Sequence, residues 1–522
     1  MKYRKIEVFE STLRDGAQGE GISYSVEDKI KIVKLLDELG IDFIEAGNPG
    51  SNQKDIEFFK KVEKLELSHS KLVAFGSTRR KNIDVKEDNN LKALLGVKTE
   101  YVSIFGKAWD FHATEVIGVS LEENLIMIEE SIKFLAENGK KVFFDAEHFF
   151  DGYKANPEYA MEVLKIAEKS GAISLVLCDT NGGCFPREIS EIVKEVKKNF
   201  KVSIGIHAHN DTGMAVANTI CAVEEGSNHV QGTIIGTGER CGNTNLSTVI
   251  SNLELKKNYL CLNKKENFSK LTHIARTIAE ISNISLESGM PYVGTSAFSH
   301  KAGMHIDGVL KYSKSFEHID PSVVGNNRRF LTSEISGRNT VLKKINNFFP
   351  EIKKESPVVG KVVKALKELE YAGYQFEGAE ASFELLLLKE MGKYKSMFEI
   401  EHFTTITNKD KLVSAMIKIN IDGKSEITAA EGNGPVNALD FALRKGLENF
   451  YPTLKETHLS DYKVRVLNSS SATGAKVRVL IETKKEDYVW TTVGVSTDII
   501  EASLTALKDS IEYSLLINKE EY

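Results

Sequence analysis

Long apolar segments, cysteine pairs and blocks of a single charge are all missing from this sequence, and each absence excludes a class of protein. The longest apolar runs, such as Leu385 to Leu388, are far too short to cross a bilayer. The five cysteines include no C-x-x-C pair, which fits a reducing compartment better than a disulfide framework. The first residues, MKYRKIEVFE, lack the apolar core of a secretion signal. A soluble, cytoplasmic protein with no membrane partner is therefore expected.

Charge is balanced and spread along the chain, so nucleic acid is not an expected partner. Lys and Arg number 68 against 74 Asp and Glu, which gives a formal net charge of −6. No basic stripe or acidic tail interrupts this mixture. The chain has 522 residues, of which 41% are hydrophobic, and this is too long for one ordinary core. Two or three domains are predicted.

The first 260 residues alternate short β-branched or aromatic runs with longer amphipathic stretches. The runs that predict strands span residues 5–11, 41–47, 71–77, 100–106, 141–147, 173–179, 202–209 and 229–236. Several of the helical patterns between them end at a glycine, namely Gly40, Gly139, Gly171 and Gly226. Eight strand–helix repeats indicate a (β/α)8 barrel. A doubly wound sheet would need a nucleotide-type glycine loop after the first strand, where this chain reads S-T-L-R-D-G-A-Q.

Unusual polar residues fall where the predicted barrel strands end. They are Arg14, Asp15, Gln18, Glu147, Thr180, His207 and His209, and the loop G-T-G-E-R-C-G-N (236–243) follows the eighth strand. Active sites of such barrels form at this end, from the loops that follow the strands. Polar residues with only a structural role would be scattered over both ends. The pattern therefore predicts one site at the carboxyl ends of the strands.

Two histidines in the seventh strand predict a metal site. His207 and His209 are two residues apart, so their side chains point to the same face of the strand. The first strand neighbours the seventh across the eighth, and Asp15 at its end could complete a two-histidine, one-carboxylate set. Asn243, in the loop after the eighth strand, could add a neutral oxygen. The alternative is a hydrogen-bonded histidine pair with Asp15 as a helix cap.

Four motifs in order resemble the 2-isopropylmalate, homocitrate and citramalate synthase family. They are T-L-R-D-G-A-Q (12–18), H-A-H-N-D-T-G (207–213), G-E-R-C-G-N (238–243) and H-K-A-G-M-H-I-D-G (300–308), and the resemblance runs the length of the chain. It implies a TIM-barrel enzyme that uses acetyl-CoA and a divalent cation, Mn²⁺, Mg²⁺ or Zn²⁺. The implied ligands are Asp15, His207 and His209, with Asn243 as a weaker or water-mediated fourth.

The implied reaction assigns roles to the other polar residues. Arg14 is placed to stabilise the alkoxide charge that develops as a carbon–carbon bond forms. Gln18 orients the 2-oxo acid, and Thr180 hydrogen-bonds its carboxylate. Asp145 shares an inward strand face with Glu147, which contacts the substrate and is a candidate base. His305 is the competing candidate for the base, and the sequence does not decide between them.

Two stretches resemble the branch of the family that makes citramalate. They are F-D-A-E-H-F-F-D-G-Y-K-A-N-P-E-Y-A (144–160) and A-F-G-S-T-R-R (74–80). This branch condenses acetyl-CoA with pyruvate and hydrolyses the thioester, a step that feeds isoleucine biosynthesis. A larger 2-oxo acid, as in 2-isopropylmalate or homocitrate synthesis, is the first alternative. Aromatic residues near strand ends, Phe75, Phe105 or Phe143, would favour the small acid if they point inward.

Two other function classes compete with a synthase. A lyase or carboxyltransferase on the same barrel would break the bond, but the C-terminal module described next argues against it. A non-catalytic amino-acid sensor would not need Arg14, Glu147 and the three candidate ligands. A synthase is therefore the preferred hypothesis.

The second half of the chain predicts two further domains. The barrel is expected over 1–275, and a mostly helical connecting segment over 276–372 contributes His305. From 373 to 522 strands are predicted at 381–391, 396–408 and 412–423. A strand ending in E-G-N-G-P and one ending in V-G-V-S each lead into a helix, which indicates a duplicated βββα unit. In the family such a domain is regulatory, binds a branched-chain amino acid, here isoleucine, and forms a homodimer.

Overall fold

The computed structural model describes residues 4–330, 342, 345–346, 349–350, 352–353, 356–376, 378–407, 412–467, 474–485 and 488–517. The chain divides into two compact units, and each is described by itself. The first unit is Met1–Phe298 with Ile319–Asn327, and the second is Ser299–His318 with Arg328–Tyr522. Within the described ranges, no helix has the length and apolar character that a bilayer crossing requires.

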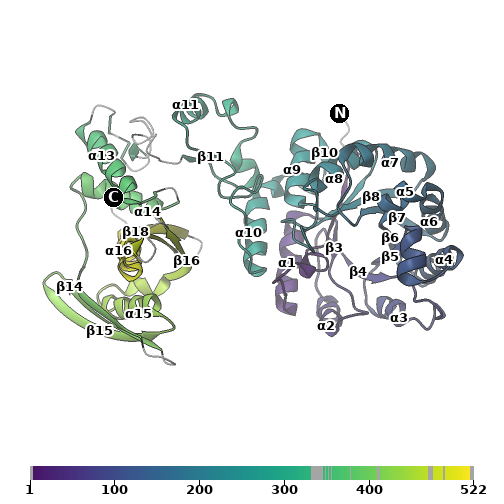
Figure 1. Ribbon diagram of the computed structural model, residues 1–522, viewed down its shortest axis with the longest axis horizontal. Helices are drawn as coiled ribbons and strands as arrows, with labels where there is room; N and C mark the ends of the chain where they lie inside the picture. Colours follow the sequence, from purple (N-terminus) through teal and green to yellow (C-terminus); the bar gives the residue numbers. More distant parts are fainter. Residues whose placement is uncertain are drawn as a thin grey trace. The chain divides into compact units, whose positions relative to one another are not determined.

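Eight parallel strands close into a barrel in the first unit, as the alternation predicts (Figure 1). They are β2 (Glu7–Glu10), β3 (Phe43–Glu45), β4 (Lys71–Ser77), β5 (Tyr101–Lys107), β6 (Lys141–Glu147), β7 (Ala172–Asp179), β8 (Ser203–Ala208) and β9 (His229–Gly232). Closure comes from β2, which pairs with β3 on one side and with β9 on the other. Because β9 also pairs with β8, the first barrel strand, β2, and the seventh, β8, lie on either side of β9.

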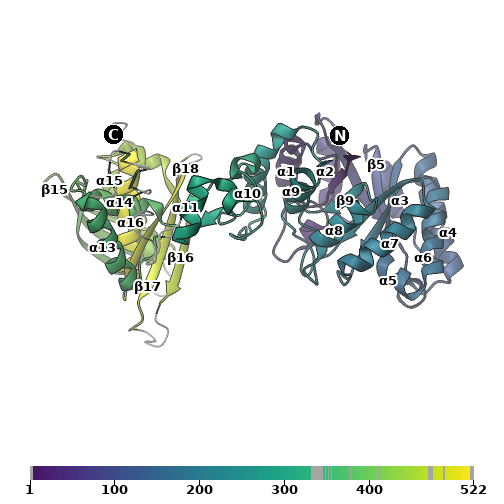
Figure 2. The ribbon, with the colours of Figure 1, turned by 90° about the horizontal axis from the view of Figure 1, so that it is seen from above.

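Helices cover the outside of the barrel, and Figure 2 shows α4, α6 and α7 around the strands. The helices are α1 (Val26–Leu39), α2 (Gln53–Val62), α3 (Asn89–Gly96), α4 (Leu121–Glu137), α5 (Phe149–Ala155), α6 (Pro157–Lys169), α7 (Pro186–Asn199), α8 (Ala215–Glu224) and α9 (Leu246–Lys256). A π-helix, η2 (His112–Ile117), precedes α4. A short pair, β1 (Arg4–Lys5) with β10 (Tyr259–Leu260), lies outside the barrel, and α10 (Leu271–Ile281) follows it.

Local signals in the sequence fix the ends of these helices. Ser25 and Asp28 form a capping box at the start of α1, which satisfies two of its free backbone N–H groups. The helix ends at Gly40, whose φ of 94° is in the left-handed region that glycine adopts without strain. The other three predicted helix-ending glycines also have positive φ, so all four signals are confirmed.

An aromatic layer fills the lower interior of the barrel. Phe9, Phe43 and Phe143 pack ring against ring, with centroids 5.0 Å apart for Phe43 and Phe143 and 5.4 Å apart for Phe9 and Phe143. Val73 completes this buried cluster. Phe143 points inward, but it packs in this layer and does not line the cavity at the carboxyl ends of the strands. Side chains two residues apart on a strand point to the same face. Asp145, two residues nearer the carboxyl end of the same strand, therefore reaches the cavity that the polar residues line.

The second unit contains two βββα units in succession, as predicted. The first is β13 (Glu399–Ile406), β14 (Val413–Ile421), β15 (Lys424–Gly432) and α15 (Pro435–Leu447). The second is β16 (His458–Val466), β17 (Val477–Lys485), β18 (Tyr488–Ser496) and α16 (Ile499–Ile517). Each set of strands is an antiparallel sheet, and each helix packs on the last two strands of its own sheet (Figure 1).

The strand expected at 381–391 is wrong, because Glu380–Glu390 forms the helix α14. Its run of four leucines has no periodicity that separates a strand from a buried helix. The segment also lacks β-branched residues and is rich in Ala, Glu and Leu, which are strong helix formers. Residues on every side of α14 are buried, since it contacts α13 (Pro357–Ala372), α16 and β18. Tertiary burial therefore hides the amphipathic pattern.

The remaining part of the second unit is mostly helical. It contains β11 (Ser299–His300), paired with β12 (Arg329–Phe330), and the helix α11 (Gly303–Lys311). The ring of His300 is buried, and its Nε2 lies 3.0 Å from Glu317, which also binds Arg328. This is a structural hydrogen-bonding role.

Candidate active site

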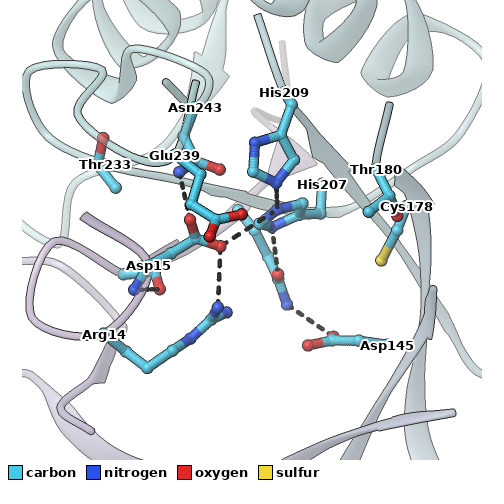
Figure 3. A network of polar contacts seen from close by, with 12 residues as sticks. Arg14, Asp15, Asp145, Cys178, Thr180, His207, His209, Thr233, Glu239 and Asn243 are labelled. Carbon is cyan, nitrogen blue, oxygen red and sulfur yellow. Dashed lines mark hydrogen bonds and ion pairs between the residues drawn. The ribbon is translucent and has the colours of Figure 1, made fainter. Parts of the chain in front are cut away.

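A cavity of about 240 Å³ opens at the carboxyl ends of the barrel strands. Its walls comprise Arg14, Asp15, Gln18, Phe75, Phe105, Asp145, Glu147, Cys178, Thr180, His207, His209, Glu239 and Arg240. Every polar residue that the sequence places at the barrel strand ends is among them. Figure 3 shows the polar contacts at the centre of this cavity, which we call the site cavity.

Asp15, His207 and His209 converge on one point of the site cavity. The Nε2 atoms of the two imidazoles lie 3.3 Å apart, and the Oδ2 atom of Asp15 is 3.6 Å from Nε2 of His207. One ligand atom from each residue lies within 4.8 Å of the others, and all three residues are buried. Two imidazole nitrogens and a carboxylate oxygen that face one another fit a divalent cation.

Asn243 reaches the same point from the loop after β9. Its Nδ2 donates to Oδ1 of Asp15 at 2.8 Å, and its backbone bridges to His209. Its Oδ1 is buried without a hydrogen-bond partner. A buried oxygen normally has a hydrogen-bond partner. Its lack of one here, beside two imidazoles and a carboxylate, suits a site that binds a cation. Asn243 thus holds Asp15 and presents an oxygen beside it.

Charges around Asp15 determine its protonation. Burial alone would raise the pKa of Asp15, but the nearby charge of Arg14 and the two imidazoles hold it below its usual range. Burial lowers the pKa of His207 to about 4. Around neutral pH the carboxylate is therefore charged and this imidazole neutral, which are the forms that bind a metal.

Arg14 is held rigidly beside the candidate ligands. Its Nε donates to Glu45 at 2.7 Å, its Nη1 donates to Asp15 at 2.9 Å, and its guanidinium carbon lies 3.8 Å from the centre of the Phe75 ring. Burial would lower the pKa of Arg14, but the carboxylates of Glu45 and Asp15 raise it above its usual range. The site therefore contains a fixed positive charge with the planar face packed on an aromatic ring.

Asp145 lies deeper in the site cavity than Glu147. Ser103 donates to its Oδ2 at 2.8 Å and Gln231 donates to its Oδ1 at 3.1 Å, while burial raises the pKa of Asp145 to about 7. Glu147 is only partly buried and forms an ion pair with Lys107. The hydroxyl of Thr180 accepts from the backbone N–H of His148 at 2.8 Å, which leaves its own hydrogen for another acceptor.

The loop after β9 closes over the site with the help of two glycines. A Cβ atom at Gly238 would lie 2.2 Å from Nδ2 of Asn243, and one at Gly242 would lie 2.1 Å from the carbonyl oxygen of Gly236. Arg240 ties the loop to its neighbours through two hydrogen bonds to Asp211, at 2.8 and 2.9 Å, and one to the carbonyl oxygen of Thr180 at 2.7 Å. The motif G-E-R-C-G-N therefore forms part of the rim of the site cavity.

An aromatic wall borders the polar centre. Phe75 and Phe105 both line the site cavity and stack on each other, with ring centroids 5.6 Å apart and planes inclined by 20°. These two rings point inward, which is the orientation in which they are predicted from the sequence to favour a small acid. Phe143 does not belong to this wall.

Two functional neighbours escaped the sequence reasoning. Glu45 orients Arg14, and Gln231 accepts from Nδ1 of His207 at 3.0 Å. Both side chains are fully buried at inward positions of strands. A signal was present, because a charged or amide residue inside an otherwise apolar strand needs a buried partner.

His305 lies on α11 in the second unit. Its ring is exposed and stacks on Phe316 with centroids 4.2 Å apart. Its catalytic role stays a prediction.

Comparisons with known proteins agree along the chain. Family models match over three ranges: HMGL-like at 5–278, homocitrate synthase post-HMGL domain-like at 292–373, and LeuA allosteric (dimerisation) domain at 377–515. An (R)-citramalate synthase of Aquifex aeolicus is 50% identical over 99% of both chains. One of Geobacter sulfurreducens is 49% identical over 99% of this chain and 98% of its own. A 2-isopropylmalate synthase of Pyrococcus furiosus is 30% identical over 96% of this chain and 98% of its own.

Proposed function

The chain belongs to the (R)-citramalate synthase family, and we propose that it condenses acetyl-CoA with pyruvate to give (R)-citramalate and free CoA. It is an enzyme of the condensing acetyl-CoA type, from a metal-dependent family. The proposed reaction converts the acyl group into an alkyl group on transfer and feeds isoleucine biosynthesis. The observation that carries the proposal is the convergence of Asp15, His207 and His209 beside Arg14 in the site cavity.

We assign Asp15, His207 and His209 as the metal ligands, with the oxygen of Asn243 as a weaker fourth. When bound, the cation supplies Lewis-acid polarisation of the keto group of the 2-oxo acid. Two nitrogen donors and one carboxylate suit Mn²⁺ or Zn²⁺, and Mg²⁺ is the third candidate.

The surrounding residues stabilise charge and orient the acid. Removal of a proton from the acetyl methyl group gives a carbon nucleophile, which bonds to the keto carbon while the carbonyl electron pair moves to oxygen. Arg14, fixed by Glu45 and Asp15, places its charge where this alkoxide forms. Water then hydrolyses the thioester and releases CoA.

The remaining contacts hold the 2-oxo acid. The hydroxyl of Thr180 donates to the acid's carboxylate, Gln18 orients the acid from the rim, and Asp145 lies beneath it. The methyl group of pyruvate faces the wall formed by Phe75 and Phe105. An apolar wall on this side suits a methyl group, which supports the smaller acid.

An assay of CoA release tests the reaction. Acetyl-CoA is supplied with pyruvate, 2-oxobutyrate, 2-oxoisovalerate or 2-oxoglutarate, before and after removal of divalent metal with a chelator. Pyruvate should give the highest kcat/KM, and chelation should abolish turnover until Mn²⁺ is restored. Activity with 2-oxoisovalerate alone would instead indicate 2-isopropylmalate synthesis, and full activity without metal would contradict the metal centre.

Replacing one ligand tests the metal centre. His207→Ala removes one nitrogen donor, so the content of bound metal and the turnover should both fall to background while the circular dichroism spectrum is unchanged. His273→Ala is the matched control, because His273 is exposed on α10 in the same unit. Metal bound to His207→Ala as tightly as to the unmodified protein would exclude His207 as a ligand.

Two residues, Glu147 and His305, are the candidates for the base that removes the methyl proton. Glu147 lines the site cavity and pairs with Lys107. The variants Glu147→Gln and His305→Gln are compared at equal metal content. Loss of the base should lower kcat by about 10²–10⁴-fold, because that is the usual contribution of a positioned base. If a variant retains most of its kcat and still exchanges the acetyl methyl protons with deuterated water, the substituted residue is not the base.

We propose that residues 1–275 are catalytic, 276–372 connect, and 373–522 regulate the enzyme and form a homodimer. The LeuA-type family match at 377–515 and the duplicated βββα units support this division. Isoleucine, the end product of the pathway, is the proposed inhibitor. Adding isoleucine to the CoA-release assay should lower the rate with pyruvate, whereas leucine at the same concentration should act more weakly. An unchanged rate would contradict this regulation.

A further inference from the structure

We propose that Gln231 is a positioning residue for the metal centre, because its side-chain amide fixes His207 in the tautomer whose Nε2 lone pair faces Asp15. This inference rests on the proposed ligand role of His207. It concerns the inside of the barrel, where a line of buried polar side chains runs from the site cavity towards the opposite mouth.

The amide of Gln231 is fully buried at the centre of this line. Its Oε1 lies 3.0 Å from Nδ1 of His207. Its Nε2 lies 3.1 Å from Oδ1 of Asp145 and 3.4 Å from Nε2 of His229. One amide therefore contacts three ionisable residues from three strands, β8, β6 and β9 itself.

These contacts give the amide one consistent direction. With Asp145 in its charged form, turning the amide over would bring its oxygen against a carboxylate oxygen, acceptor against acceptor. The NH₂ group therefore faces Asp145 and His229, and the amide oxygen faces His207. An amide oxygen can only accept, so Nδ1 of His207 must carry the hydrogen. Nε2 of His207 is then left with a free lone pair, which is directed towards Asp15 and Nε2 of His209.

His229 supports the other end of the amide. Its ring is fully buried among Phe9 and Phe143, at centroid distances of 5.3 and 5.1 Å. Gly205 makes room for the ring, since a Cβ there would lie 2.7 Å from Cδ2 of His229. In this direction of the amide, Nε2 of His229 accepts from Gln231 at 3.4 Å and its Nδ1 carries the hydrogen, which lies beyond hydrogen-bond distance of Glu7, since Oε2 is 3.8 Å away. Aromatic packing thus fixes the ring of His229 beside the NH₂ group of Gln231.

Removal of the amide should loosen metal binding without removing a ligand. Groups that hold the second nitrogen of a metal-binding histidine typically contribute about 10–100-fold to metal affinity. Gln231→Met keeps the length of the side chain and removes both hydrogen-bonding functions. His207 is then free to rotate or to place its hydrogen on Nε2, where it blocks the metal.

The test is titration of metal-free, full-length protein with Mn²⁺ alone, followed by calorimetry. Gln231→Met should bind Mn²⁺ about 10–100-fold more weakly than the unmodified protein. Thr272→Val is the matched control, because it removes another buried hydrogen bond of the same unit, to the carbonyl oxygen of Val324 at 2.6 Å, away from the site cavity. Its affinity should be unchanged. Equal weakening in both variants, or none in Gln231→Met, would overturn the role of Gln231.

A second measurement does not depend on how well a variant folds. Long-range ¹⁵N NMR of histidine-labelled, metal-free protein reports the tautomer of each ring, and His207→Ala identifies the signal. The Nδ1–H tautomer is expected for His207, and the Nε2–H tautomer would overturn the inference. If the unmodified protein binds no Mn²⁺, the proposed metal centre itself fails. If it binds Mn²⁺ and His207→Ala does not, while Gln231→Met binds normally, only the present inference fails.

Discussion

The pairing of β2 with β9 is the constraint on which the site depends. It aligns Glu7 with His229 and Glu10 with Gly232, and so closes the barrel between segments more than two hundred residues apart in the chain. Without this closure Asp15, which follows the first strand, would not meet the histidines that end the seventh. The hydrogen bond from Asn243 to Asp15 crosses the same junction. The candidate metal centre is therefore a product of topology, since no local segment contains it.

The second feature is the concentration of acidic groups inside an apolar barrel. Glu10, Glu45 and Asp145 are all fully or nearly fully buried, and burial raises the pKa of Glu10 and of Asp145 to about 7. Breaking a buried ion pair by removing one partner typically costs about 3–5 kcal/mol, so Arg14 stabilises the fold as well as presenting a charge. The same side chain thus has two functions. Substitution of Arg14 would therefore affect the structure around Glu45 as well as the chemistry.

Much of this arrangement could be predicted from the sequence, for reasons that are physical. Strand–helix alternation and helix-ending glycines identify the barrel, and the rule that sites form at strand ends locates Arg14, Asp15, His207 and His209. The features that could not be predicted from the sequence depend on tertiary contacts. The segment 381–391 is a helix whose periodicity is hidden by burial on all sides, and Phe143 faces inward but two residues below the level of the polar side chains. Glu45 and Gln231 could not be identified because their partners, Arg14 and His207, are distant from them in the sequence.

The aromatic layer of Phe9, Phe43 and Phe143 determines how substrates enter and products leave the enzyme. These rings plug the barrel below the polar level, so the lower mouth does not serve as a passage for reactants. Both substrates, the attacking water and both products then share the doorway at the carboxyl ends of the strands. A thioester bound at this single opening would cover a small acid bound beneath it, which favours entry of the acid first.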